Sequence, residues 1–254
     1  MLEARALTKR YRGVAAVDHV SFAAARGVVT GFLGPNGAGK STTVKMLIGL
    51  VPPSSGEVLF EGRNVERDLL EYKRRLGYVP EEPHVYTYLT GREYLQLVGR
   101  LRGLSEKTLS RRIDGFLDLL GLAAHRYSPM TAYSKGMKQK VLIAAALVAD
   151  PDVLVFDEPL SGLDVTSALV VRHLIHKLAA EGRVVLFSSH VLEVVEKVCS
   201  RVIILHKGRL VADDGVGRLR ELKNLASLEA VFTEIVAQED TSRAADDLLS
   251  VMKA

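Results

Sequence analysis

Cysteine is almost absent from this chain, which has only Cys199 among its 254 residues. A single cysteine cannot form an internal disulfide, and this one lies in an apolar helical pattern, so we expect a reducing, cytosolic compartment. No run approaches the ~18 apolar residues of a membrane span, and the stretch from Met1 to Arg5 lacks the apolar core of a signal peptide. Any role at a membrane is therefore expected to come through a partner.

The chain also lacks a basic block interleaved with aromatic residues. Its formal net charge is only +4, from 34 Lys and Arg against 30 Asp and Glu. Because nucleic-acid binding needs a concentrated basic face, we expect no nucleic-acid partner. We find no repeat or low-complexity segment, and a hydrophobic content of 48% with 25% charged residues is typical of a globular chain.

The most informative stretch is a glycine-rich loop that follows an apolar strand predicted at 28–33 and precedes a helix beginning near Gly39. It has the pattern G-x-x-x-x-G-K-[ST], which in this context predicts a phosphate cradle lined by backbone N–H groups. Lys40 would reach the β- and γ-phosphates of a nucleotide, and the Ser41 hydroxyl would bind Mg²⁺. A glycine-rich turn without a ligand is the disfavoured alternative. The predicted nucleotide-binding residues are Gly34, Pro35, Asn36, Gly37, Ala38, Gly39, Lys40, Ser41 and Thr42.

Two acidic residues, Asp157 and Glu158, follow directly after a second apolar strand at 153–156. In a parallel sheet both strands end at the same edge, so these acids are expected to face the phosphate loop. Asp157 would then hold Mg²⁺ through water, while Glu158 would polarise the water that attacks the γ-phosphate. The alternative is a solvated pair that caps the next helix, which a complete phosphate loop disfavours.

The remaining pattern predicts an α/β fold with a mostly parallel sheet around a P-loop NTPase core. Alternating residues near the N-terminus predict an antiparallel β subdomain, and helical spacing predicts an α-helical subdomain inserted at about 83–150. Lys207 and Gly208 are a hairpin signal. Besides those already given, strands are predicted at 4–7, 17–23, 57–60, 77–79, 184–187, 202–205 and 209–211, and helices at 68–76, 135–148 and 166–180.

A further segment, from Tyr133 to Gln139, resembles the LSGGQ signature of the nucleotide-binding subunits of ATP-binding cassette (ABC) transporters. The resemblance runs from about Leu2 to beyond Leu210, and the signature variant is most like those of the ABC-2 type exporter ATPases. Physically, Ser134 is a good N-cap and Gly136 permits close approach, so this helix N-terminus suits a γ-phosphate. Without the neighbouring motifs it would be an ordinary capped helix. The resemblance implies an ABC ATPase domain at 1–215 and a C-terminal helical extension at 216–254.

Single residues take roles by the same resemblance. Tyr11 stands where the family stacks an aromatic ring on adenine, although a lone tyrosine is more often a core or surface ring. Asp164, in the segment 161–164, would link the two sites of a dimer, and the same letters also fit a plain loop and N-cap. His190 matches the histidine that contacts the γ-phosphate, although a lone histidine is usually structural. Glu81 replaces the usual glutamine, and its carboxylate would ligate Mg²⁺ or position water.

The resemblance also implies a mechanism that one chain cannot complete. Two ATPase subunits, as a homodimer or heterodimer, would pack head to tail, so that Ser134, Lys135 and Gly136 close on ATP held by the other subunit. ATP hydrolysis would power a separate transmembrane permease, with this chain peripheral on the cytoplasmic face. One alternative is a soluble ABC ATPase in DNA repair or translation, and those usually carry two cassettes or a long coiled coil. A nucleotide-binding scaffold without turnover is disfavoured by Glu158 and His190.

Overall fold

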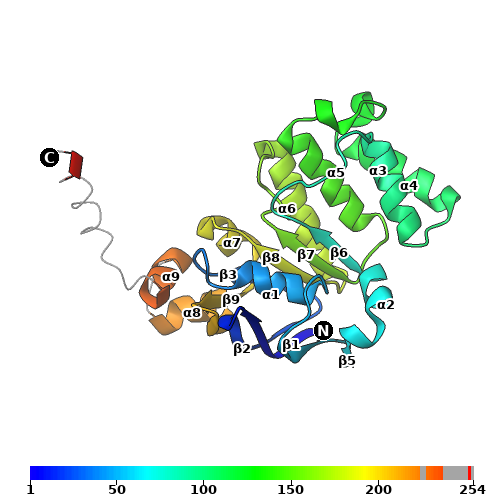
Figure 1. The fold of residues 1–254 in the computed structure, drawn as a ribbon. Coiled ribbons are helices and arrows are strands. Elements are labelled where there is room, and N and C mark those ends of the chain that lie inside the picture. The colour runs from blue at the N-terminus through cyan, green and yellow to red at the C-terminus, as the bar shows by residue number, and fades with distance from the viewer. Residues whose placement is uncertain (224–226, 237–250, 253–254) are drawn as a thin grey trace.

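The structure is a computed structural model, and it describes residues 1–223, 227–236 and 251–252. Two β-sheets lie in layers, with α1 (Lys40–Leu47) between them and most other helices beyond the larger sheet (Figure 1). The strands are β1 (Leu2–Tyr11), β2 (Val14–Ala24), β3 (Val29–Leu33), β4 (Ser55–Phe60), β5 (Arg63–Asn64), β6 (Leu76–Val79), β7 (Val153–Asp157), β8 (Val184–Ser188), β9 (Arg201–His206) and β10 (Arg209–Gly215). The other α-helices are α2 (Leu69–Arg74), α3 (Gly91–Leu101), α4 (Glu106–Leu119), α5 (Lys135–Leu147), α6 (Val165–Ala180), α7 (Leu192–Val198), α8 (Val216–Lys223) and α9 (Leu228–Val236).

The larger sheet has the strand order β10-β9-β3-β8-β7-β6 and is parallel except at β10. Its register pairs Phe32 of β3 with Ser188 of β8, and Ser188 with Asp157 of β7. The carboxyl ends of these three strands therefore meet at one edge, as the sequence predicts. The smaller sheet, β2-β1-β4-β5, is the predicted antiparallel β subdomain.

Side chains of the parallel strands alternate between two hydrophobic cores. Phe32, Val155 and Leu186 face α1 and the antiparallel sheet, whereas Phe156 and Phe187 face α5, α6 and α7. Because helices and strands cover both faces, the interiors of these strands are buried and mostly apolar, and they read as short apolar runs in the sequence. The polar residues Asp157 and Ser188 lie where β7 and β8 end, at the carboxyl edge of the sheet.

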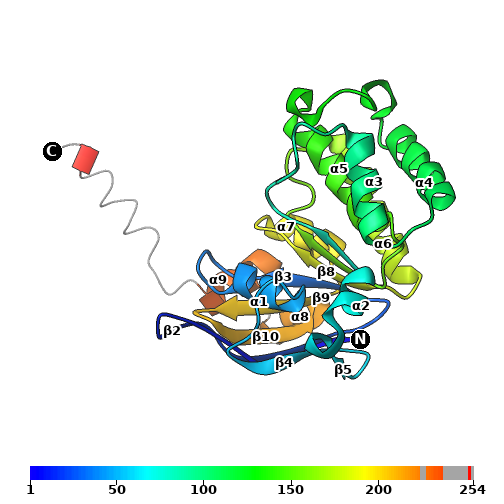
Figure 2. The same ribbon diagram turned by 45° about the vertical axis from the view of Figure 1, so that its right-hand side comes forward.

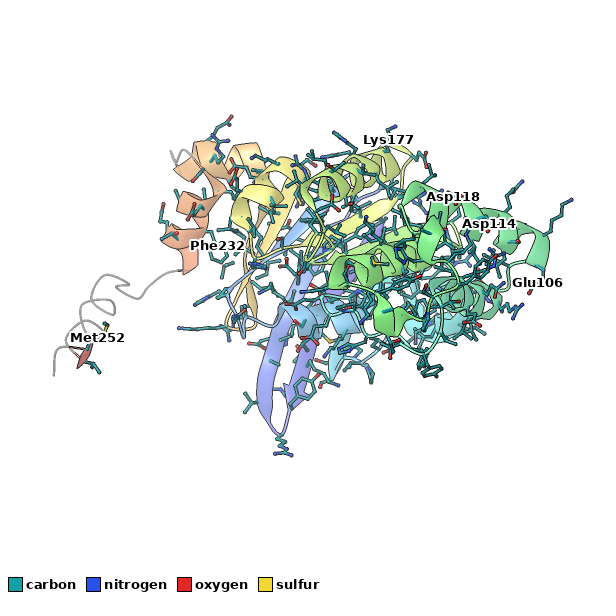
Figure 3. The ribbon with its side chains drawn as sticks, turned by 90° about the horizontal axis from the view of Figure 1, so that it is seen from above. Glu106, Asp114, Asp118, Lys177, Phe232 and Met252 are labelled. Atoms are coloured by element: carbon teal, nitrogen blue, oxygen red, sulfur yellow. The ribbon has the colours of Figure 1, made fainter. Side chains whose placement is uncertain are left out.

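The inserted helical subdomain has its own core beneath α3 and α4, which stand above the sheet in Figure 2. Thr90 and Glu93 form a capping box that starts α3, with Glu93 N–H 3.1 Å from Thr90 Oγ1. The polar side of α4 faces outward, where Figure 3 shows Glu106, Asp114 and Asp118. The fifth helix, α5, contributes side chains both to this core and to the core over the parallel sheet, so it joins the two parts.

Helices α8 and α9, at the start of the predicted C-terminal extension, pack on the core that lies over α7. Leu219 of α8 and Val231 of α9 are buried there, and Phe232, labelled in Figure 3, covers them partly. Glu196 of α7 joins both helices, accepting from Arg220 Nη1 at 2.9 Å and from the Leu228 N–H at 3.2 Å. The rest of that extension, 224–226, 237–250 and 253–254, lies outside the described residues.

Some predicted boundaries differ from the structure: β1 and β10 are longer than the strands predicted at 4–7 and 209–211, and one predicted helix is too long. The helix predicted at 68–76 ends at Arg74, and Leu76 already belongs to β6, where it pairs with Val153. Leu76 has helical spacing in the sequence, but it is buried and pairs with β7 as the first residue of the edge strand β6. Within the part of the chain that the structure describes, no helix has the length and apolarity to cross a membrane.

Candidate nucleotide site

The glycine-rich loop wraps around the start of α1 in a backbone conformation that only glycine adopts easily. Gly39 is the N-cap residue with φ +97°, and Gly34 has φ +153°. A Cβ on Gly34 would lie 2.4 Å from the Leu205 carbonyl oxygen, and one on Gly39 would lie 2.5 Å from that of Ala16. No atom lies within 4 Å of a Cβ placed on Gly37, so this part of the loop faces open space. The loop therefore has a packed outer side and an open inner side.

Lys40 reaches back across the loop. Its ammonium donates to the carbonyl oxygens of Gly34, at 2.5 Å, and Pro35, at 3.0 Å. Burial lowers the pKa of Lys40, while the charges of Asp157, Glu158 and Glu81 oppose that shift. The charges of all three predicted carboxylates thus act on the predicted cation, as expected for groups of one site.

Two serines on the neighbouring strand hold the two acids at the end of β7. The Ser188 hydroxyl donates to Asp157 Oδ1, and the Ser189 hydroxyl donates to Glu158 Oε2 at 3.1 Å. The backbone N–H of His190 donates to Glu158 Oε1, and its ring Nδ1 lies 2.9 Å from the same oxygen. Sequence reasoning missed both serines. Their position beside His190 at the end of an apolar strand is the signal that could have found them.

Glu158 has an unusual backbone conformation for a non-glycine residue, with φ +47°. Such a conformation is strained and persists only where surrounding contacts fix it. Its N–H donates to the Ser188 carbonyl at 3.1 Å, and its side chain is only 13% exposed. The carboxylate is therefore fixed, and it is not the solvated helix cap considered as the alternative.

An open cavity of about 500 Å³ lies directly beside Glu158 and His190. Its walls come mainly from the segment before α6, from α6 itself and from the start of α7. Several of its apolar side chains are exposed, with Val165 at 79% and Leu169 at 44%. Apolar surface at the rim of a polar site is typical of a face that receives another protein surface.

Two predicted residues lie at the margins of this site. Tyr11 ends β1 with its ring 46% exposed, and the Lys9 ammonium lies 5.5 Å from the ring centroid. The exposed ring is free to stack on a planar ligand. Glu81 is exposed. Burial raises the pKa of Tyr78 to about 12, and the negative charges of Asp157 and Glu81 add to this effect.

The signature helix α5 does not join the phosphate loop of its own chain. Ser134 caps it as predicted, and Lys135 Nζ donates to Ser161 Oγ at 2.9 Å. A Cβ on Gly136 would lie 2.4 Å from the Gly162 carbonyl oxygen, so the two backbones are in close contact. In Figure 1, α5 lies in the upper half of the molecule and α1 in the lower half.

Asp164 is the N-cap of α6, accepting from the Ser167 N–H at 2.9 Å and its hydroxyl at 2.6 Å. These bonds hold the pKa of Asp164 below its ordinary value. Lys140 Nζ lies 3.8 Å from its carboxylate, and Gln139 Nε2 donates to the Pro159 carbonyl at 3.2 Å. The segment 159–164 is thus bound to α5 at several points.

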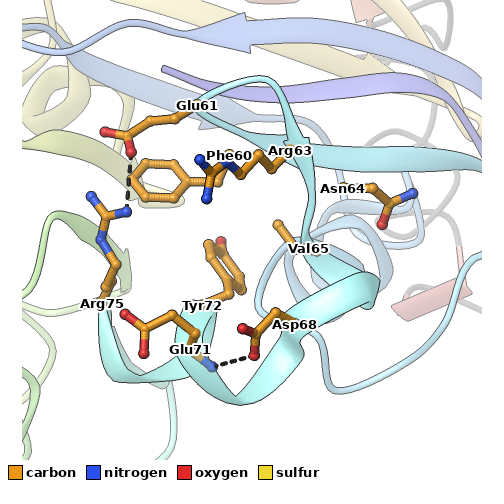
Figure 4. Close-up of a pocket in the computed structure, with 9 residues that line it drawn as sticks. All are labelled: Phe60, Glu61, Arg63, Asn64, Val65, Asp68, Glu71, Tyr72 and Arg75. Carbon is orange, nitrogen blue, oxygen red and sulfur yellow. Dashed lines mark hydrogen bonds and ion pairs between the residues drawn. The ribbon is translucent and has the colours of Figure 1, made fainter.

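A second cavity, of about 430 Å³, lies between the β4–β5 turn and α2 (Figure 4). Its charged groups largely satisfy one another. Arg75 lies 4.6 Å from the Phe60 ring centroid and bonds Glu61 at 3.0 Å, and Asp68 caps the N–H of Glu71. It contains none of the predicted site residues.

The donors at the sheet edge fit a magnesium ion. Mg²⁺ in phosphate sites usually takes one or two carboxylates together with waters and phosphate oxygens, without a cage of protein ligands. Asp157 and the exposed Ser41 hydroxyl are donors of that kind. Accordingly, no group of three or more His, Cys, Asp or Glu suited to a metal occurs among the described residues.

Comparison with known proteins agrees with this geometry. The sequence profile of the family described as ABC transporter matches residues 17–161. The chain is 38% identical over 220 residues to the ABC transporter ATP-binding protein NatA of Bacillus subtilis, across 86% of this chain and 89% of NatA. It is 35% identical over 212 residues to the Nod factor export ATP-binding protein I of Ralstonia nicotianae, across 84% and 66% of the two chains.

Among solved structures, the post-hydrolysis dimer of the ATP-binding cassette MJ0796 with bound ADP and phosphate superposes with a TM-score of 0.78. The two chains are 25% identical, and the match covers 85% of this chain and 98% of the other. The chain therefore belongs to the ABC transporter family and is one of its ATPase subunits.

Proposed function

We propose that this subunit hydrolyses ATP at a site completed by a second ATPase subunit, and that the cycle powers an exporter. The observation that carries the proposal is the separation of two phosphate-binding elements in one chain. The phosphate loop gathers Lys40 with Asp157, Glu158 and Glu81, whereas the N-terminus of α5 is bound to the segment 159–164 of its own chain. A head-to-tail dimer brings each loop to the other subunit's α5.

In the first half of the site, Gly34 to Thr42 enclose the phosphates with backbone N–H groups and Lys40 neutralises their charge. Tyr11 stacks on adenine. Glu158 takes a proton from the attacking water, and the serine and histidine contacts that fix its carboxylate keep it in place for this step.

Ser41 and, through water, Asp157 would hold a magnesium ion, which would supply positive charge against the phosphates. Ser188 orients Asp157 by donating to its carboxylate. Glu81 lies on the same side and supplies either a further ligand or a fixed negative charge.

In the second half, Ser134, Lys135 and Gly136 present the positive end of α5 to the γ-phosphate on the other subunit. The exposed apolar side chains beside Glu158 and His190 belong to the face that this dimer covers. His190 contacts the γ-phosphate, and Asp164 lies in the segment that joins the two sites. ATP thus stabilises the closed dimer, and loss of the γ-phosphate releases it.

Export is the direction favoured by the signature variant and by the named activity of the Nod factor relative. The partner is a separate transmembrane permease, and the subunit lies against it on the cytoplasmic face. Tyr86 and Tyr88, which are 55% and 72% exposed, begin the surface that receives the permease.

Phosphate release by the purified chain tests the enzymatic part of the proposal. Wild type is expected to release phosphate from ATP and Mg²⁺, Glu158→Gln to bind ATP with little release, and Lys40→Met to bind weakly. The exposed Glu66→Gln serves as a control for loss of a carboxylate. Turnover at the wild-type rate in Glu158→Gln would contradict the role of Glu158.

Sedimentation tests the dimer separately. Glu158→Gln is expected to sediment as a dimer in ATP and Mg²⁺ and as a monomer in ADP. A monomer in both nucleotides, with ATP demonstrably bound, would refute the completed two-subunit site while leaving nucleotide binding intact.

A further inference from the structure

The turn between β9 and β10 lies against the phosphate loop, although it is distant in sequence. Its two central residues, Lys207 and Gly208, have φ +48° and +79°, the values of a type I′ hairpin turn. The smaller sheet has a matching turn between β4 and β5, where Glu61 and Gly62 have φ +53° and +76°. The two turns therefore have the same backbone shape in different surroundings.

The backbone of Gly208 bonds on both sides. Its N–H donates to the Ala38 carbonyl of the phosphate loop at 3.1 Å, and its carbonyl accepts from the Asp18 N–H of β2 at 2.8 Å. Next to it, Arg209 Nη2 lies 2.8 Å from Asp18 Oδ2. The turn thus connects the phosphate loop to the antiparallel sheet that carries Tyr11.

The bond to Ala38 has a direct consequence for the loop. In a planar trans peptide, the C=O and the following N–H point in opposite directions. Because the Ala38 oxygen is held against Gly208, on the packed outer side, the N–H of Gly39 points to the other side of the loop. That N–H is one of the donors of a phosphate cradle.

Space around the turn is limited by one carbonyl oxygen, that of Ala16 in β2. A Cβ on Gly208 would lie 3.0 Å from this oxygen, and a Cβ on Gly39 would lie 2.5 Å from it. The oxygen therefore has glycines on two sides. An added methyl group at 208 would press the turn away from β2 and disturb its bond to Ala38, because Ala16 has little room to yield toward Gly39.

We infer that Gly208 is a positioning residue for the phosphate cradle, acting through the Ala38 carbonyl to aim the Gly39 N–H at the nucleotide phosphates. The inference rests on the proposed function, because it takes the loop from Gly34 to Thr42 as the phosphate site. It adds a residue from the turn between β9 and β10, late in the sequence, to a site otherwise built from the loop and the ends of the central strands.

Equilibrium binding of ATP and of ADP to the full chain tests this role, with Gly208→Ala compared against Gly62→Ala. Both variants place a methyl group at a positive φ in a hairpin turn, but no atom lies within 4 Å of a Cβ on Gly62. Thermal melting without nucleotide measures the strain that the two share. Gly208→Ala is expected to raise the Kd for ATP and for ADP by the same factor, about five- to tenfold, the effect of one weakened hydrogen bond.

Gly62→Ala is expected to leave both Kd values within about twofold of wild type, a difference below ~0.5 kcal/mol. Equal Kd changes in the two variants would overturn the inference. So would a loss of affinity for ATP without a loss for ADP, since the cradle contacts phosphates that ATP and ADP share. If Gly208→Ala does not fold, Gly208→Asn and Gly62→Asn decide by the same criteria, because asparagine tolerates positive φ better. Failure of wild type to bind either nucleotide would instead refute the proposed function.

Discussion

Replacing Glu81 by glutamine tests whether this carboxylate binds Mg²⁺ or only adds negative charge beside the phosphates. The charge of Glu81 acts on the Lys40 ammonium, as do those of Asp157 and Glu158. Glu81 is exposed, so its charge acts largely through water, where two unit charges about 4 Å apart interact by about 1 kcal/mol. A charge-only role therefore limits the change in ATP affinity to about fivefold.

On that reasoning, Glu81→Gln should tighten ATP binding without Mg²⁺ by about two- to fivefold, because one repulsion is removed. The gain should shrink at an ionic strength of about 0.5 M, where exposed charges are screened. The Mg²⁺ concentration that gives half-maximal phosphate release should stay near the wild-type value. Isothermal titration with and without Mg²⁺, at two salt concentrations, measures the first two quantities.

Glu82→Gln is the matched control, since it removes the adjacent exposed carboxylate. That carboxylate lies 3.3 Å from His84 Nε2, and its charge is not one of those that shift the pKa of Lys40. It should change ATP affinity less than Glu81→Gln. If Glu81→Gln instead weakens binding and raises the Mg²⁺ requirement by tenfold or more, the charge-only reasoning is wrong and Glu81 is a metal ligand.

Three other perturbations have defined outcomes. Ser189→Ala removes the hydroxyl that donates to Glu158 and should lower kcat for phosphate release about tenfold, with a smaller change in KM. Ser189→Thr keeps a hydroxyl and should restore kcat. An unchanged kcat in Ser189→Ala would contradict a positioning role for Ser189. Hydrogen bonds from Arg26 and, next in size, from Arg75 lower the pKa of Glu61. The ionised Glu61 therefore stabilises the folded protein above its ordinary pKa of 4.5, and this stabilisation is lost as the pH falls through the lower pKa of the folded state. The urea midpoints of wild type and Glu61→Gln should accordingly converge in acid, and a constant difference would be inconsistent with this. The double variant Tyr86→Ala, Tyr88→Ala should keep basal phosphate release but lose its stimulation by a co-purified permease. Full stimulation would show that these tyrosines do not belong to the surface that receives the permease.

The sequence predicts those features of the fold and site that depend on short, local patterns. The phosphate loop is recognisable because its glycines, lysine and serine lie within a few residues of one another, between an apolar strand and a helix. The acids at Asp157 and Glu158 follow from the apolar strand before them. Their convergence on Lys40 follows from the rule that parallel strands end at one edge.

Contacts between distant segments could not be predicted in this way. Ser188 and Ser189 acquire their roles only through the strand order that places β8 beside β7. Gly208 is recognisable as part of a turn, but nothing in its neighbourhood in the sequence indicates that the turn lies against Ala38. The same holds for α5. The sequence shows its apolar residues as one helical pattern, but in the structure they are divided between two cores.

One such distant contact links the two halves of the proposed site within a single chain. The N-terminus of α5 is bound to the segment 159–164 through Lys135 and Ser161 and through the close approach of Gly136 to Gly162. That segment begins directly after Glu158, whose positive φ leaves its backbone little freedom. When α5 closes on a phosphate of the other subunit, it must carry this segment with it or break these contacts. On the proposed two-subunit mechanism, the position of Glu158 is therefore expected to respond to engagement of the same subunit's signature helix, which would couple hydrolysis at one site to closure of the other.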